Sequence, residues 1–255
     1  MAVRQRLCRP SDFISEIIML EVKIKKRMPG FELQVSFSCL DGGITVLTGP
    51  SGAGKTTLIR IMAGLTKADE GCIVHNGTVW FDSVSRVNLL PRQRKIGYVF
   101  QEHTLFPHLT IAGNINLISN DRAETDRLLG LFKIRHIAAR RPYQVSGGER
   151  QRAAFAQALA RKPEALFLDE PFSALDITTR GRLQEELLKL KTTLSIPIVH
   201  VTHDPDEAGL LADCTVEINR EFAASAPVFS AAGFTRRRCW PRINVSDQLT
   251  TPNFI

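Results

Sequence analysis

The sequence predicts an α/β protein whose mainly parallel sheet is covered by helices on both faces. Four short apolar segments rich in β-branched residues end at turn signals, which is typical of buried strands. They are ITVLTG (44–49), IGYVF (96–100), ALFLD (165–169) and PIVHVT (197–202). Helix-like patterns lie between these segments, and strands that alternate with helices favour parallel crossover connections.

Two helix patterns and one long helical region complete the predicted fold. KTTLIRIMAGL (55–65) follows the first strand. GRLQEELLKLKTTL (181–194) places four leucines on one helical face, namely Leu183, Leu187, Leu190 and Leu194. The region 102–164 has no strong strand pattern. We therefore expect a helical subdomain at about 102–164, inserted between two halves of the sheet core.

The composition indicates an ordinary soluble globular protein. Of the 255 residues, 44% are hydrophobic and 23% are charged, and no apolar run approaches the roughly 20 residues needed to cross a bilayer. The five cysteines are scattered and never in C-x-x-C spacing, which predicts neither a disulfide framework nor a zinc site. No secretion signal is recognised at the N-terminus. We therefore expect a cytoplasmic chain.

The net charge of +7 does not predict a specific nucleic-acid partner. Of this charge, +3 lies in 222–255 and +1 in 1–18, which leaves +3 for 19–221. A basic tail can attract anionic lipid or nucleic acid weakly. The sequence has no basic stripe interleaved with aromatic residues, so specific reading of nucleic acid is not expected.

The segment GPSGAGKT (49–56) predicts a phosphate-binding loop, or P-loop, because it matches G-x-x-x-x-G-K-[ST] and lies between a strand and a helix. Glycines let the backbone fold so that successive N–H groups face the phosphates. Lys55 supplies a positive charge for the β- and γ-phosphates, and the Thr56 hydroxyl is a ligand for Mg²⁺. The expected nucleotide-binding residues are Gly49, Pro50, Ser51, Gly52, Ala53, Gly54, Lys55, Thr56 and Thr57.

The apolar segment ALFLDE (165–170) ends in two carboxylates, Asp169 and Glu170. A carboxylate at the end of a buried strand is costly unless a cation or a proton donor is near. Together with the phosphate-binding loop, this pattern favours Asp169 as part of the Mg²⁺ shell. Glu170 is then the candidate base that polarises the attacking water.

A second candidate anion site lies at VSGGERQR (145–152), where Ser146, Gly147 and Gly148 open a helical segment. Helix N-termini present unpaired N–H groups and the positive end of the helix dipole. A plain helix N-cap is the alternative interpretation. Two phosphate-binding turns in one chain, with 91 positions from Lys55 to Ser146, require an explanation.

With GPSGAGKT, VSGGERQR and ALFLDEP in this order along the chain, the sequence resembles the ATPase subunits of ABC transporters, over about 19–221. Gln101 falls at the Q-loop of that family, which senses the γ-phosphate and touches the membrane permease. SALD (173–176) resembles the D-loop, which places Asp176 at the dimer seam. His203 resembles the switch histidine that holds the γ-phosphate. The resemblance also implies an antiparallel β part near the N-terminus.

The resemblance explains the two anion sites. In this family two ATPase subunits pack head to tail, and each ATP lies between the phosphate-binding loop of one chain and the signature motif of the other. The corresponding signature here is Ser146, Gly147, Gly148 and Glu149, where Glu149 replaces the glutamine of many members. The resemblance implies Mg²⁺ as cofactor, with Thr56, Asp169 and Gln101 around it, and Glu170, Gln101 and His203 as catalytic residues.

Within the family, the chain is most similar to the ATPases of molybdate or tungstate importers. The similarity rests on three segments, MLEVKIKKRMPGFELQVSF (19–37), LPRQRKIGYVFQ (90–101) and LFPHLT (105–110). It implies an integral membrane permease and, indirectly, a periplasmic or extracellular substrate-binding protein as partners, with the chain peripheral on the cytoplasmic face of the membrane. The alternatives are an importer of sulfate, iron or polyamine, a soluble non-transport ABC ATPase, and a decayed product that binds ATP without coupling.

Three features depart from the family pattern. Residues 1–18 precede the expected start at Met19 and are either a mis-set start or a disordered extension. Phe31 is the candidate aromatic that stacks on adenine, with a core position as the alternative. The tail 222–255 loses the pattern abruptly and suggests a shifted reading frame, so no regulatory β-domain is expected.

Overall fold

The computed structural model describes residues 18–101 and 105–218, which form two five-stranded sheets with helices around them. The expected extension before residue 18 and the atypical tail 222–255 lie outside the described residues. The strands are β1 (Ile18–Met28), β2 (Phe31–Leu40), β3 (Ile44–Thr48), β4 (Glu70–His75), β5 (Thr78–Asp82), β6 (Val87–Asn88), β7 (Ile96–Val99), β8 (Ala165–Asp169), β9 (Ile198–Val201) and β10 (Cys214–Glu217).

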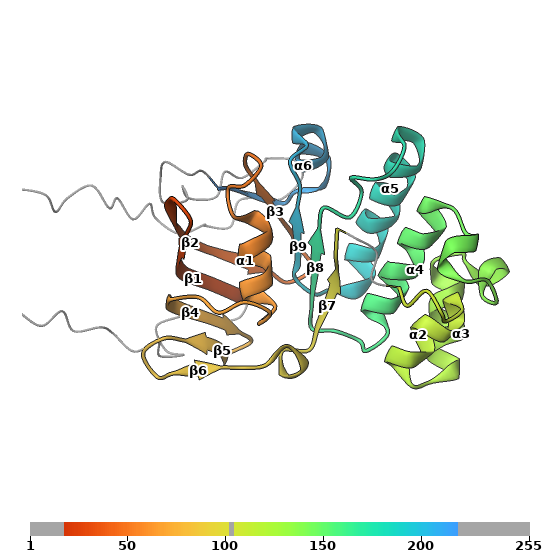
Figure 1. The fold of residues 1–255 in the computed structure, drawn as a ribbon, viewed down its shortest axis with the longest axis horizontal. Coiled ribbons are helices and arrows are strands. Elements are labelled where there is room, and N and C mark those ends of the chain that lie inside the picture. Colours follow the sequence, from red (N-terminus) through yellow and green to blue (C-terminus); the bar gives the residue numbers. More distant parts are fainter. Residues whose placement is uncertain (1–17, 102–104, 219–255) are drawn as a thin grey trace, which may run out of the picture.

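Except for α1, the α-helices of the described residues all follow β7 in the chain (Figure 1). The α-helices are α1 (Lys55–Met62), α2 (Ile111–Ser119), α3 (Arg122–Leu131), α4 (Gly147–Leu159), α5 (Ile177–Leu194) and α6 (Pro205–Leu211). Short 3-10 helices are η2 (Pro91–Gln93), η3 (Arg135–Ile137) and η4 (Pro142–Gln144).

The parallel sheet has the strand order β10-β3-β9-β8-β7, and all of its pairs are parallel. It contains the four strands predicted from sequence, so the predicted parallel α/β core is confirmed. The fifth strand, β10, was not among the predicted strands. Strand β8 is buried along its whole length, which explains why its sequence is continuously apolar rather than alternating.

The antiparallel sheet has the order β2-β1-β4-β5-β6 and confirms the antiparallel part implied by the family resemblance. Strand β2 alternates regularly, with Leu33, Val35, Phe37 and Cys39 buried and the residues between them more exposed. One face of this sheet therefore packs inward while the other meets solvent.

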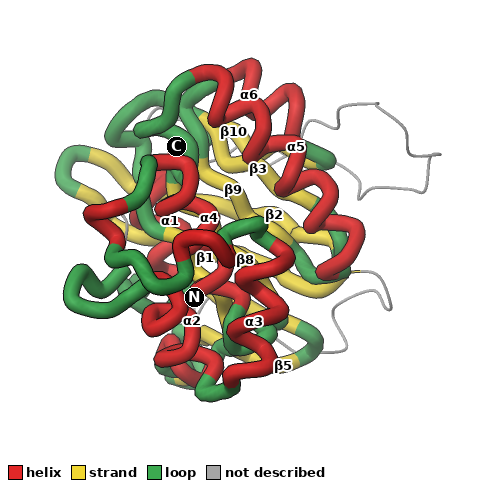
Figure 2. The backbone as a smooth tube through the Cα atoms, turned by 90° about the vertical axis from the view of Figure 1, so that its right-hand side faces the viewer, coloured by secondary structure: helices red, strands yellow, loops and turns green. Residues whose placement is uncertain are grey.

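Two hydrophobic cores lie on opposite faces of the parallel sheet. Along β8, Leu166 and Leu168 join the helical-side core with residues of α2 to α5, whereas Ala165 and Phe167 join the α1-side core with α1 and the antiparallel sheet. Successive side chains of a strand point to opposite faces, so one strand supplies both cores. Figure 2, which looks at the molecule from the side of the helices, shows α3 and α5 in front of the strands.

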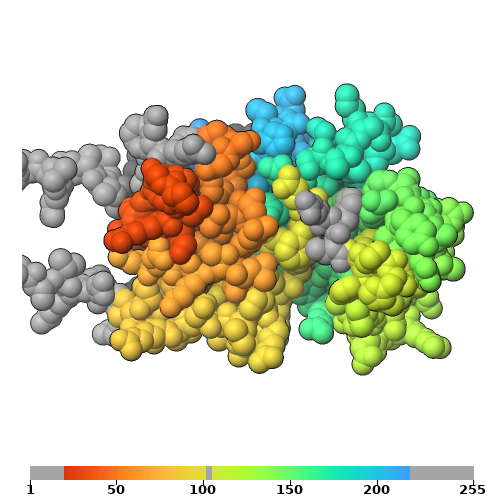
Figure 3. All heavy atoms as spheres, in the orientation of Figure 1, coloured from red at the N-terminus to blue at the C-terminus, as the bar shows by residue number. Residues whose placement is uncertain are grey.

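The region 102–164, predicted to be helical, contains α2, α3 and α4 between β7 and β8. The described part of this region forms one end of the molecule, while the antiparallel sheet forms the other end (Figure 3). The inserted helical subdomain of the predicted fold is therefore confirmed. No helix of the described residues has both the length and the apolarity that a membrane span requires.

Arg94 joins the antiparallel sheet to the end of α1 and was not identified from sequence. Its side chain is 1% exposed. The guanidinium donates hydrogen bonds to the carbonyls of Ile61 and Met62 at 2.9 and 2.7 Å, and to that of Leu89 at 3.0 Å. Burial lowers the pKa of Arg94 to about 10, so it remains a cation that satisfies carbonyls at the helix C-terminus.

We predict that Arg94→Ala lowers the free energy of unfolding by about 3 kcal/mol, because it leaves several buried carbonyls without donors. Urea denaturation followed by circular dichroism measures this change. Arg92→Ala is the matched control: Arg92 is exposed, and its removal is expected to cost less than about 0.5 kcal/mol. Equal effects of the two substitutions would show that Arg94 does not hold the end of α1.

Candidate functional site

The carboxyl ends of three neighbouring strands, β3, β9 and β8, meet at one edge of the parallel sheet. Leu47 pairs with Val201, and Val201 pairs with Asp169. The loops that follow these strands carry the phosphate-binding loop, His203 and Glu170 respectively. Ligands of open parallel sheets bind at this edge, so the fold alone marks it as the candidate site.

The phosphate-binding loop has a backbone that two of its glycines make possible. Gly49 has φ 137°, and a Cβ there would lie 2.1 Å from the carbonyl oxygen of Ile218. Gly54 is the N-cap of α1 with φ 99° in the left-handed region. Side chains other than glycine are strained in these conformations, so both positions require glycine.

Helix α1 differs from the other described α-helices at its start. Side chains cap α2 to α6, namely Thr110, Asp121, Ser146, Asp176 and Asp204. The N-cap of α1 is Gly54, and no side chain caps that helix. The first amides of an α-helix have no partner within the helix, so the start of α1 is suited to an anionic ligand.

Lys55 lies inside the phosphate-binding loop and is 5% exposed. Its Nζ donates hydrogen bonds to the carbonyls of Gly49 at 2.6 Å and Pro50 at 3.0 Å. Burial lowers the pKa of Lys55, while the charges of Glu170 and Asp169 act in the opposite direction. The loop thus folds around its own cation.

Asp169 is 1% exposed at the end of β8 and has donors on both oxygens. Thr56 Oγ1 lies 3.0 Å from Oδ1, and Tyr98 Oη lies 3.1 Å from Oδ2. Burial raises the pKa of Asp169, and the two hydrogen bonds oppose this shift. Burial also raises the pKa of Tyr98, which keeps its hydroxyl protonated and able to donate.

The three residues predicted to be catalytic lie together. Glu170 Oε2 is 3.4 Å from Gln101 Nε2 and 3.1 Å from His203 Nδ1. They follow the adjacent strands β7, β8 and β9, and Glu170 has φ 46°. A left-handed non-glycine residue is costly and is common at functional sites.

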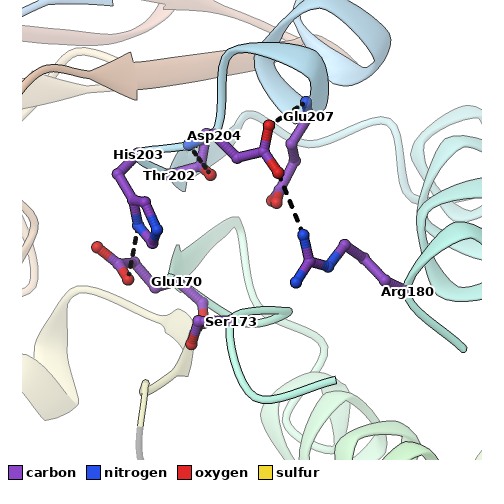
Figure 4. Close-up of a pocket in the computed structure, with 7 residues that line it drawn as sticks. All are labelled: Glu170, Ser173, Arg180, Thr202, His203, Asp204 and Glu207. Carbon is purple, nitrogen blue, oxygen red and sulfur yellow. Dashed lines mark hydrogen bonds and ion pairs between the residues drawn. The ribbon is translucent and has the colours of Figure 1, made fainter. Parts of the chain in front are cut away.

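Glu170 and His203 line a pocket, and the His203 ring points toward the Glu170 carboxylate (Figure 4). On its opposite side, Arg180 Nη1 donates to Asp204 Oδ2 at 3.1 Å. This pair links α5 to the residue that follows His203. Sequence reasoning missed the pair, because the partners are 24 positions apart and no spacing rule joins them.

Phe31 begins β2 at the rim of the phosphate-binding loop. A Cβ on Gly54 would lie 3.8 Å from Phe31 Cζ. The Phe31 ring is also partly buried against the α1-side core. Its position therefore agrees with both interpretations from sequence, and it adjoins the candidate site.

The signature residues lie apart from the phosphate-binding loop. They open α4, which packs in the helical-side core, whereas α1 packs on the other face of the sheet (Figure 1). Ser146 and Gly147 are exposed. Asp176 caps α5 through Thr179 N at 3.0 Å, and a Cβ on Gly148 would lie 2.5 Å from Thr179. The predicted dimer-seam residue thus adjoins the signature.

Tyr98 is a site residue that sequence reasoning missed, because its partner Asp169 belongs to another strand.

We predict that Tyr98→Phe lowers the free energy of unfolding by about 2 kcal/mol, since a buried carboxylate loses a donor. Urea denaturation tests this. Tyr143→Phe is the control, because Tyr143 is 64% exposed and its change is expected to be below about 0.5 kcal/mol. If both variants behave as the parent protein does, the Tyr98 hydroxyl is not needed by Asp169.

Comparison with known proteins places this site in a family. Residues 33–173 match the ABC transporter family model. The chain is 38% identical to the molybdenum import ATP-binding protein ModC of Pseudomonas aeruginosa over 82% of its own length and 60% of that protein. For ModC of Paramagnetospirillum magneticum the identity is 40%, over 84% and 61% of the two lengths. The chain thus spans about 60% of the curated relatives it matches.

Solved structures share the fold. The ATP-binding cassette MJ0796, solved as a post-hydrolysis dimer bound to ADP and Pi, is 28% identical with a TM-score of 0.70, covering 85% of this chain and all of that one. The ATP-binding cassette MJ1267 in its ADP conformation is 22% identical with a TM-score of 0.73, covering 85% and 92% of the two chains, and supports the fold alone. With the family model matched over more than half of its residues, this chain belongs to the ABC transporter family.

Proposed function

We propose that this chain is the ATP-hydrolysing subunit of an ABC importer that takes up an oxyanion, molybdate or tungstate. The observation that carries the ATPase proposal is the convergence of Gln101, Glu170 and His203 next to the phosphate-binding loop. The cargo is proposed from the relatives, whose names state molybdenum import.

The phosphate-binding loop is proposed to hold the phosphates of ATP. The uncapped start of α1 offers N–H groups and the positive end of the helix dipole. Lys55 exchanges its two loop carbonyls for β- and γ-phosphate oxygens, which relieves the cost of holding a buried ammonium. Phe31, at the rim of the loop, is the proposed stacking partner of adenine.

The donor set fits Mg²⁺. Thr56 Oγ1 and Asp169 Oδ1 lie 3.0 Å apart, and Mg²⁺ favours one or two oxygen ligands from protein together with phosphates and water. No group of three or more His, Cys, Asp or Glu residues able to hold a metal occurs within 18–101 and 105–218, and a nucleotide-borne ion needs none. When bound, the ion would neutralise charge on the β- and γ-phosphates. Thr56, Asp169 and Gln101 are the proposed residues around it.

Glu170 is the proposed base for hydrolysis. A water between its carboxylate and the γ-phosphate attacks phosphorus, and the water proton passes to Glu170. The bond from phosphorus to the ADP oxygen breaks, and ADP and phosphate leave. His203 and Gln101 hold the carboxylate from two sides, and His203 is proposed to contact the γ-phosphate.

A second copy of the chain is proposed to complete each site. The start of α4 lies on the opposite face of the sheet from α1, so Ser146, Gly147 and Gly148 do not reach the ATP of their own chain. Head-to-tail pairing brings them to the partner's nucleotide, with Asp176 at the seam. A solved relative, the cassette MJ0796, is a dimer bound to ADP and Pi, which supports pairing of two copies. The proposed partners beyond the dimer are an integral membrane permease and a substrate-binding protein.

We predict that Glu170→Gln retains ATP binding but loses steady-state hydrolysis by about 10²-fold or more, because the amide cannot take the water proton. Phosphate release measures hydrolysis, and equilibrium dialysis measures binding. Glu185→Gln is the control, because Glu185 is exposed on α5. We expect this variant to hydrolyse ATP as fast as the parent protein does. Unchanged turnover in Glu170→Gln would remove Glu170 from the role of base.

The cargo is tested with the chain and its membrane partner in lipid vesicles. We predict that a substrate-binding protein loaded with molybdate or tungstate stimulates ATP hydrolysis severalfold, and that the same protein offered sulfate does not. Stimulation by sulfate alone would contradict molybdate or tungstate as the cargo and would favour a sulfate importer. Recovery of the chain with ribosomes or nucleic acid instead of a permease would favour a non-transport ABC ATPase.

A further inference from the structure

An acidic side chain stands where the proposed function places an anion. Glu149 is the third residue of α4, and its neighbours Ser146 and Gly148 are proposed to face the γ-phosphate of the partner's ATP. A carboxylate near a phosphate weakens binding through like-charge repulsion. It also offsets part of the positive helix dipole that attracts the anion. The structure must therefore constrain or compensate this charge.

Both oxygens of the Glu149 carboxylate have donors. Oε2 accepts from Ser146 N at 2.9 Å and from Ser146 Oγ at 2.8 Å, which forms a capping box. Oε1 lies 2.8 Å from His136 Nε2. The backbone and side-chain hydrogen bonds of Ser146, and then His136, lower the pKa of Glu149 to about 2. Glu149 is therefore ionised at neutral pH.

The carboxylate contact fixes the tautomer of His136. An ionised carboxylate only accepts hydrogen bonds, so Nε2 must carry a proton in both the neutral and the charged imidazole. Neighbouring cations point elsewhere: Arg150 Nε donates to the Pro142 carbonyl, and Arg135 Nη2 donates to the Asp126 carbonyl. Among the described side chains, His136 is thus the basic group that the structure pairs with Glu149.

The backbone around His136 is fixed in place. His136 lies in η3, between α3 and α4, and is 64% exposed at its side chain. The next residue, Ile137, is completely buried in the helical-side core. Ala112 N donates to the Ala138 carbonyl at 2.9 Å, which ties this turn to α2. The backbone that carries the imidazole is therefore held by the core and by α2.

We propose that His136 is a positioning residue for the signature motif. It donates a hydrogen bond to the Glu149 carboxylate and holds it against Ser146, so that the start of α4 can receive the partner's ATP. This inference rests on the proposed function of the signature. Removing the imidazole leaves Glu149 bound by Ser146 alone, with its full charge directed at the incoming phosphate.

The test measures ATP-dependent dimerisation of the full chain in the Glu170→Gln background by light scattering. We expect His136→Ala to weaken the dimer by about fivefold per site, the size of one lost hydrogen bond to a carboxylate, and hence by about 25-fold for the two sites. Glu149→Gln keeps a capping box and is expected to dimerise at least as tightly as the background protein. His136→Ala is then expected to have no effect in the Glu149→Gln variant.

The control is His108→Ala, which removes an exposed histidine that the structure does not pair with the signature. Unchanged dimerisation of His136→Ala would overturn the inference. So would an equal loss in the Glu149→Gln variant, because His136 would then act through folding rather than through Glu149. If the background protein binds ATP and stays monomeric, the proposed function fails, and this inference fails with it.

A second measurement does not depend on dimerisation. The ¹⁵N shifts of the His136 ring in the ATP-free protein are expected to show the proton on Nε2 in the neutral imidazole. They are expected to lose this preference in Glu149→Gln. A neutral ring protonated on Nδ1 in the parent protein would overturn the inference, whatever the outcome of the dimer assay.

Discussion

The buried carboxylate of Asp169 is the constraint on which the site depends. An ionisable group that is 1% exposed is tolerated only with hydrogen-bond partners. Thr56 supplies one partner from the start of α1, and Tyr98 supplies the other from β7. The position of Asp169 therefore links the phosphate-binding loop, β7 and β8, and the next residue in the chain is the proposed base. A shift of the phosphate-binding loop or of β7 would leave one carboxylate oxygen without its donor.

Capping divides the described α-helices into two kinds. Five begin with a side chain that accepts a hydrogen bond from their first turn, whereas α1 begins with Gly54 and has no such cap. A capped helix start is stabilised within the chain, while an uncapped one remains suited to an external anion. The signature helix α4 is capped by Ser146, but its capping box also includes the charged Glu149 and lies where the proposed function places phosphate.

The parallel sheet separates the phosphate-binding loop from the signature, because the helices that begin at these two motifs pack on opposite faces of the sheet. Strand β8 sends alternate side chains to the α1-side core and the helical-side core. The phosphate-binding loop leads into α1, which packs in the α1-side core, whereas the signature opens α4, which packs in the helical-side core. A rigid sheet between them keeps the two motifs apart within one chain. This separation is the structural reason why the proposed site needs a second copy.

The sequence by itself determined the parallel core, the phosphate-binding loop and the order of the motifs. These features are local, because glycine conformation, apolar runs and helix caps are encoded by neighbouring residues. Gln101, Glu170 and His203 were also predicted from sequence, and they lie together because they follow adjacent parallel strands. Only the tertiary structure decided that Tyr98 donates to Asp169, that Arg94 holds the end of α1, and that His136 pairs with Glu149. These contacts join different elements, and no periodicity or spacing along the chain specifies which polar side chains meet once the cores have packed.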